Sequence, residues 1–126
     1  MTNKIDNLVP GGISIHAVDV ARGIPASGLK VNLNRVEPDL TKVAHGFCAE
    51  NGHFTHPMVD GAGIMRGLYE VKFGVGDYYR KSSVDLPDPP FLDEAVFCFG
   101  IDRVSEHFHL PFKFTPWGFS MFRGGA

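Results

Sequence analysis

Hydrophobic and polar residues alternate in short segments along this chain, and glycine or proline separates one segment from the next. A period of two places the hydrophobic side chains on one face of a β-strand and the polar side chains on the other. The segments are residues 13–18, 29–36, 68–75 and 107–115. Short segments bounded by turn-forming residues predict an all-β domain with at most one short helix.

The segment 107–115 separates its two faces most clearly. Its phenylalanine and leucine residues alternate with His107, His109, Pro111 and Lys113. If the hydrophobic residues face a core, both histidines point to the opposite, accessible side, which predicts a chemical or binding role for that side. Pro111 has no amide hydrogen, so we expect this strand to lie at the edge of a sheet or to carry a bulge.

The segment 13–18 has the same organisation. Its accessible face carries Ser14 and His16. Its other face is hydrophobic and is expected to be buried, and it consists of Ile13, Ile15 and Ala17.

Further along the chain, the pair Asn51-Gly52 predicts a type I′ turn, because both residues tolerate the positive φ angles that this turn requires. The turn would present His53 directly after it. Three prolines in residues 85–90 remove three backbone donors and predict a connecting loop. Residues 95–101 are almost all hydrophobic and predict a largely buried strand.

Length and composition indicate a single domain over residues 1–126, with residues 1–10 as a flexible N-terminal segment. The hydrophobic content of 44% is sufficient for a core of its own. About seven or eight short strands in a chain of this length predict a two-sheet β-sandwich, with a small barrel as the alternative. An edge strand rich in phenylalanine would favour a closed oligomer.

The formal net charge is −2, and acidic and basic residues are interspersed along the chain. This distribution lacks the basic stripe of a nucleic-acid-binding protein and the polybasic segment of a membrane-surface protein. No stretch reaches the roughly 20 apolar residues of a membrane span, and residues 1–10 do not resemble a signal peptide. We therefore expect a cytoplasmic protein that acts on small molecules, with no nucleic acid or membrane as partner and with Cys48 and Cys98 as reduced thiols.

Three longer stretches carry a family pattern. They are Ile15-His-Ala-Val-Asp-Val-Ala-Arg-Gly-Ile-Pro-Ala26, Gly67-Leu-Tyr-Glu-Val-Lys-Phe-Gly-Val-Gly-Asp-Tyr-Tyr79 and His109-Leu-Pro-Phe-Lys-Phe-Thr-Pro-Trp-Gly-Phe-Ser-Met-Phe-Arg-Gly-Gly125. Together and in this order, they resemble the transthyretin-related family of 5-hydroxyisourate hydrolases over nearly the whole chain. The resemblance implies a transthyretin-like sandwich of two four-stranded sheets, assembled as a homotetramer, a dimer of dimers, with active sites in its central channel. It also implies hydrolysis of the ring acyl–nitrogen bond of 5-hydroxyisourate, the unstable product of urate oxidation in purine degradation, without metal or organic cofactor.

The resemblance also implies which residues form the site. Family members use a histidine in the first strand, an arginine after a hairpin turn, a histidine before Val/Leu-Pro and a closing Tyr-Arg-Gly-Ser. The two histidines correspond to His16 and His109, which become the candidate catalytic residues. The candidate substrate-binding residues are His53, Phe122, Arg123 and Gly125.

Three positions depart from the family pattern, since His53 stands in place of arginine, Phe122 in place of tyrosine and Gly125 in place of serine. An imidazole titrates near pH 6.5 and lacks the donor fork of a guanidinium, so His53 is not a simple replacement. The three changes make the expected pocket less polar and roomier. They favour an N-methylated 5-hydroxyisourate, as formed from methylxanthines such as caffeine, because a polar group left unpaired against an N-methyl group costs roughly 1–3 kcal/mol.

The retained histidines suit this chemistry. One imidazole that titrates near neutral pH takes a proton from water and later protonates the leaving nitrogen, while the other, or His53, donates to the oxygen that becomes negative. Which of His16 and His109 is the base stays open. Arg123 would position the substrate or close the channel wall.

Two other interpretations stay open. His16, His107 and His109 could hold a zinc ion together, although no carboxylate is evidently placed to orient them. The same fold also serves as a carrier of small hydrophobic ligands, so the chain could be a non-catalytic binding protein. Apart from the site, Asp19 and Arg22 are expected to form a structural ion pair near the first strand.

Overall fold

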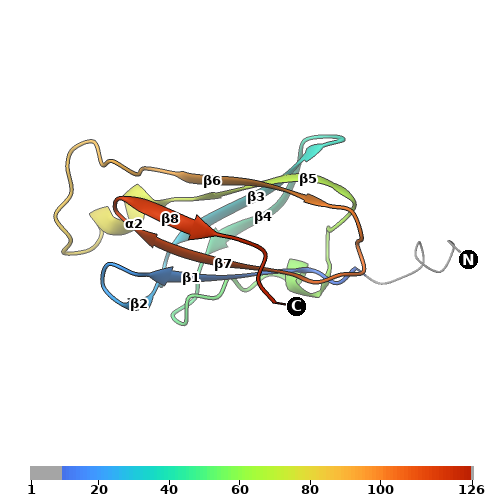
Figure 1. The fold of residues 1–126 in the computed structure, drawn as a ribbon, viewed down its shortest axis with the longest axis horizontal. Helices are drawn as coiled ribbons and strands as arrows, with labels where there is room; N and C mark the ends of the chain where they lie inside the picture. Colours follow the sequence, from blue (N-terminus) through green and yellow to red (C-terminus); the bar gives the residue numbers. More distant parts are fainter. Residues whose placement is uncertain (1–9, 126) are drawn as a thin grey trace, which may run out of the picture.

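The computed structural model of the protein describes residues 10–125 as two four-stranded β-sheets that pack face to face (Figure 1). One sheet has the strand order β2-β1-β7-β8 and consists of β1 (Ile13–Asp19), β2 (Ile24–Pro25), β7 (Phe108–Thr115) and β8 (Gly118–Met121). The other has the order β4-β3-β5-β6 and consists of β3 (Lys30–Glu37), β4 (Thr41–Phe47), β5 (Gly67–Phe73) and β6 (Ala95–Ile101). The connections contain a 3₁₀ turn, η1 (Pro57–Asp60), and a short helix, α2 (Val75–Arg80).

The predicted all-β sandwich with one short helix is therefore confirmed, and the alternative of a barrel is wrong. Within residues 10–125, no helix is long and apolar enough to cross a membrane. The predicted flexible segment 1–10 lies, except for Pro10, outside the described residues.

The core fills the space between the two sheets. In β1, β3, β5 and β7, buried residues alternate with more exposed ones, as the period of two predicts. Phe73 of β5 stacks on Phe112 of β7 with ring centroids 3.9 Å apart, and both rings are completely buried. Loss of either ring to alanine is expected to cost about 3–5 kcal/mol. This packing turns the polar faces of β1 and β7 away from the core.

β7 lies inside its sheet, between β1 and β8, so the predicted edge position is wrong. The amide of Phe108 donates to the carbonyl oxygen of Gly12 beside β1, and by alternation the amide position of Pro111 faces the other way, toward β8. However, β8 pairs with β7 only from Phe112 to Thr115. Pro111 therefore stands just beyond the end of β8, where the strand ladder needs no donor.

Two expectations about the second sheet also need correction. The strand β6 is not largely buried, because it forms an edge of the sheet, and only its end residues Ala95 and Ile101 are fully covered. The strand β4 has no counterpart among the alternating segments. Ala44 is its only fully buried residue, so a strand at this edge carries almost no hydrophobic signal.

The expected pair of Asp19 and Arg22 is confirmed and belongs to a larger network. The buried Asp19 carboxylate accepts hydrogen bonds from Arg22 Nε at 2.7 Å, from the Tyr79 hydroxyl at 2.6 Å and from the Tyr78 hydroxyl at 3.1 Å. Burial by itself raises the pKa of Asp19, but these hydrogen bonds outweigh it and lower the pKa below the usual value. The network ties α2 to the end of β1.

Candidate active site

Histidines from distant parts of the chain gather on the outer face of the first sheet. β1 and β7 run parallel, with Ser14 opposite His109 and His16 opposite Pro111. Because alternate residues share a face, Ser14, His16 and His109 all point away from the core. All three are partly exposed. The parallel register therefore brings the two predicted catalytic histidines to one accessible surface.

Ser14 connects two of these histidines. Its Oγ atom lies 2.7 Å from Nδ1 of His109 and 2.8 Å from Nε2 of His107. The other ring nitrogen of His107, Nδ1, lies 2.6 Å from the carbonyl oxygen of Gly11. The sequence pattern predicts only that Ser14 shares the outward face with His16, and its position beside His109 follows from the pairing of β1 with β7.

The turn after β4 adds a third histidine. The Ala49 amide bonds to the carbonyl oxygen of His53 and the Gly52 amide bonds to that of Ala49, which closes a tight turn. Gly52 has a φ of 84°, whereas no residue other than glycine has a positive φ among the described residues, so the predicted type I′ geometry is wrong. His53 nevertheless follows the turn directly and forms a bridge with His16.

The two rings of this bridge are stacked. The ring centroids of His16 and His53 are 4.3 Å apart, and the ring planes are inclined by 29°. The Nε2 atom of His16 lies 3.0 Å from the carbonyl oxygen of Asn51, within the same turn. Since a carbonyl oxygen can only accept, Nε2 of His16 carries the hydrogen and its Nδ1 is available on the other side of the ring.

The pKa of the His109 ring lies below its usual value, and burial is the largest cause. The neighbouring His107, His16 and His53 lower it further, because additional positive charge among them is unfavourable. His109 is therefore an uncharged imidazole at neutral pH. This state is the one that a general base needs.

The C-terminal residues reach the same region. The amide of Gly124 donates to the carbonyl oxygen of His109 at 2.7 Å, and a Cβ atom on Gly124 would lie 3.1 Å from the His109 ring. Arg123 is held beside the cluster by Glu106 and by the carbonyl oxygen of His107, with its guanidinium 4.2 Å from the centre of the Phe108 ring. Phe122 and Gly125 are exposed.

The arrangement does not favour the zinc interpretation. Both ring nitrogens of His107 are already engaged, by Ser14 and by Gly11. Within residues 10–125, no three histidine, cysteine, aspartate or glutamate side chains form a possible metal site. The expected thiol state is consistent with the geometry, since Cys48 and Cys98 are not joined by a disulfide.

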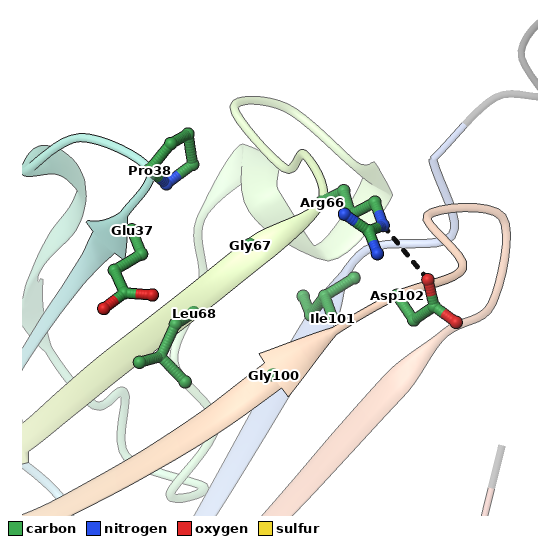
Figure 2. A pocket seen from close by; sticks show the side chains of 8 residues that line it. All are labelled: Glu37, Pro38, Arg66, Gly67, Leu68, Gly100, Ile101 and Asp102. Atoms are coloured by element: carbon green, nitrogen blue, oxygen red, sulfur yellow. Dashed lines mark hydrogen bonds and ion pairs between the residues drawn. The ribbon is translucent and has the colours of Figure 1, made fainter.

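A pocket of about 600 Å³ lies at the second sheet, and none of the histidines lines it. Figure 2 shows its lining, in which Arg66 and Asp102 form an exposed ion pair of 3.1 Å across the ends of β5 and β6. The remaining lining residues are Glu37, Pro38, Gly67, Leu68, Gly100 and Ile101. None of these groups is a nucleophile or a base placed against a second reactive group. The outward face with His16, His53, His107 and His109, the histidine surface, is therefore the better candidate for chemistry.

Curated relatives resemble the chain over most of its length. A 5-hydroxyisourate hydrolase 2 of Rhizobium meliloti is 40% identical over 117 residues, which span 90% of this chain and 96% of that protein. A 5-hydroxyisourate hydrolase of Pseudomonas aeruginosa is 37% identical over 115 residues, covering 90% of this chain and 91% of that protein.

Solved structures share the fold. The 5-hydroxyisourate hydrolase of Klebsiella pneumoniae superposes with a TM-score of 0.74 at 27% identity, covering 91% of this chain and 99% of that one. An (S)-allantoin synthase superposes with a TM-score of 0.87 at 29% identity over 94% of this chain, but this chain spans only 45% of that protein. Sea bream transthyretin, solved with thyroxine, has a TM-score of 0.78 at 18% identity, which supports the fold alone.

A sequence profile of the HIUase/Transthyretin family matches residues 13–124, from the start of β1 to the glycine that contacts His109. The profile thus covers both strands that carry the histidines and the turn that carries His53. Together with relatives at 37% and 40% identity, this match shows that the chain belongs to the HIUase/Transthyretin family.

Proposed function

We propose that this chain hydrolyses the ring acyl–nitrogen bond of 5-hydroxyisourate, with His109 as general base and His16 as its partner. Membership of the family, together with the name that its relatives share, makes the chain a hydrolase. The observation that supports this assignment of roles is the parallel register of β1 and β7, which sets His16 and an uncharged His109 on the same accessible face.

The chemistry is the addition of water across a cyclic amide. His109 removes a proton from water while the oxygen of that water attacks the ring carbonyl carbon. When His16 is protonated, its Nδ1 donates to the oxygen that becomes negative, while its Nε2 keeps its hydrogen bond to Asn51. The carbon–nitrogen bond then breaks, the proton held by His109 passes to the leaving nitrogen, and the ring opens to a carboxylic acid. The sequence of steps consumes one water and needs no redox partner.

The substrate is proposed to be an N-methylated 5-hydroxyisourate. His53, stacked on His16, presents a flat ring where the family pattern has a charged fork, and Phe122 and Gly125 present no hydroxyl. A methylated ring has fewer groups that require a hydrogen-bond partner, so a less polar wall suits it. Arg123, anchored at Glu106, would line the same wall.

The working unit is proposed to be a homotetramer. In one chain, the histidine surface is open, whereas efficient hydrolysis needs a site from which bulk water is excluded. β6 and β8 each end a sheet, and hydrophobic residues near these edges are exposed, including Phe119 at 42% and Val96 at 43%. Exposed hydrophobic edge strands are typical of surfaces that pair with another chain.

A location in the cytoplasm stays a prediction.

The proposed activity is tested by ultraviolet absorbance with freshly generated 5-hydroxyisourate and its methylated derivatives. We expect rapid decay of the substrate, fastest for the methylated form. His16→Asn and His109→Asn should each lower kcat/KM about 100-fold or more. His45→Asn, on the opposite sheet, is the matched control and should leave kcat/KM unchanged. Binding of the substrate without faster decay would instead identify a carrier, and preference for the unmethylated substrate would refute the proposed specificity.

A further inference from the structure

The hydrogen bonds around Ser14 determine where the hydrogens lie. The carbonyl oxygen of Gly11 can only accept, so Nδ1 of His107 donates to it over 2.6 Å. Neutral His107 then has its lone pair on Nε2, which accepts the hydroxyl hydrogen of Ser14 over 2.8 Å. Having given its only hydrogen, Ser14 Oγ accepts from Nδ1–H of His109 over 2.7 Å. Each step leaves one possible direction for the next when His107 carries a hydrogen on Nδ1 alone.

This order of donors leaves Nε2 of His109 without a hydrogen. We propose that Ser14 and His107 are positioning residues that hold His109 in the tautomer whose Nε2 takes the proton from water. The role in catalysis rests on the proposed hydrolysis, whereas the tautomer itself is a property of the free protein. When Nε2 takes the proton, Nδ1 is still a donor, so the bond to Ser14 persists through the reaction.

The Gly11 carbonyl oxygen, which accepts from His107, is held in place by the backbone. The Gly11 amide donates to the carbonyl oxygen of Val104 at 2.8 Å, and the Phe108 amide donates to the carbonyl oxygen of Gly12 at 2.9 Å. A Cβ atom on Gly11 would lie 2.3 Å from the carbonyl oxygen of Glu106, so only glycine allows this close approach. The acceptor of His107 is therefore held in place independently of the histidine side chains.

The tautomer is measured directly by ¹⁵N NMR of the full chain without substrate, at a pH above the pKa of His109. We expect the His109 signals of the Nδ1–H form in the natural protein. In Ser14→Ala, the acceptor is lost and the signals should shift toward the Nε2–H form. Nε2–H signals in the natural protein, or unchanged signals in Ser14→Ala, would overturn the proposal.

Kinetics test whether the tautomer matters. Ser14→Ala should lower kcat about 10- to 100-fold with KM changed less than about twofold, because hydrogen bonding around a catalytic imidazole acts on the chemical step. Ser14→Thr keeps a hydroxyl and suits a strand, so it should restore both the tautomer and most of kcat. Ser120→Ala, on the exposed side of β8, removes a hydroxyl from the same sheet and should leave both readouts unchanged.

The two proposals fail in different ways. A shifted tautomer in Ser14→Ala with unchanged kcat overturns the positioning role. An unchanged activity in His109→Asn overturns the proposed function, even when the natural protein shows the Nδ1–H signals. His107→Gln tests whether His107 takes part, because loss of the hydrogen bond to Gly11 should give a mixture of His109 tautomers. An unaltered His109 spectrum in this variant would show that His107 does not position His109.

Discussion

The ring of His53 stacks on the ring of His16, with the ring centroids 4.3 Å apart. In the sequence, 36 residues lie between these two histidines. The contact depends on backbone pairing, because the Ala17 amide donates to the carbonyl oxygen of Gly52 and the Phe54 amide donates to that of Ile15. His53 is therefore a fixed part of the histidine surface. Its side chain stands where the family pattern has arginine.

Replacement of His53 tests the proposed specificity. His53→Arg restores a charged donor fork and should raise kcat/KM for unmethylated 5-hydroxyisourate relative to the methylated form, by about tenfold for one regained hydrogen bond to a charged group. The ratio of the two rates under identical conditions is the measurement. His56→Arg, a change of the same kind at a histidine that caps η1, is the control. An unchanged ratio would remove His53 from specificity.

The pH dependence of the reaction follows from the state of His109. The base must be uncharged, and its pKa is lowered from 6.5, mainly by burial. On the acidic side of the profile, we expect kcat/KM to rise with pH through a midpoint below 6.5 as His109 loses its proton, as measured by initial rates in overlapping buffers. A midpoint above 6.5 would contradict His109 as the base in this environment.

Gly52 is expected to be essential for the placement of His53. Its φ of 84° is unfavourable for other residues, and a Cβ atom would lie 2.4 Å from the carbonyl oxygen of Ala17. Gly52→Ala should lower the melting temperature and the activity together. Gly28 has a φ of 81° and open space around it, so Gly28→Ala isolates the cost of the backbone angle, about 1 kcal/mol. Equal melting temperatures of Gly52→Ala and Gly28→Ala would show that the contact with the Ala17 carbonyl oxygen relaxes without cost.

Asp19 is expected to contribute strongly to stability. Asp19→Asn leaves the tyrosine hydroxyls and Arg22 without their buried anion and should cost about 3 kcal/mol in chemical denaturation. Since folding lowers the pKa of Asp19 from 3.8, its contribution is present above that value and is lost as the pH falls through the folded pKa. Asp102→Asn, in an exposed ion pair, should cost less than about 1 kcal/mol.

The proposed assembly is tested by analytical ultracentrifugation. The natural chain should sediment with the mass of four copies, and Phe119→Glu should yield smaller species with reduced activity, because a charge on an exposed edge strand opposes pairing. Leu40→Glu places the same charge at a residue that is 77% exposed ahead of β4 and should leave the assembly intact. A fully active monomer would refute the tetramer.

Several features of the site were predictable without coordinates, because they depend on local geometry. Alternation in residues 107–115 correctly placed His107 and His109 on the face opposite the buried phenylalanines, since both rings contact Ser14 on the outer face. Asp19 and Arg22 are three positions apart, so their pairing was also predictable. By contrast, the position of Pro111 in an interior strand was not predictable. It is tolerated because β8 ends before it, so no hydrogen bond from an amide at this position is required.

The amino-acid sequence by itself determined the class of the fold and the inward and outward face of most strands, since a two-residue period and the burial of hydrophobic side chains act within each segment. Only the tertiary structure decided which strands are neighbours. Many strand orders bury the same faces, and β7, the parallel partner of β1, lies more than 90 positions further along the chain. The register of β1 with β7 brings Ser14 beside His109, and such a contact between distant segments arises only when the whole sandwich closes.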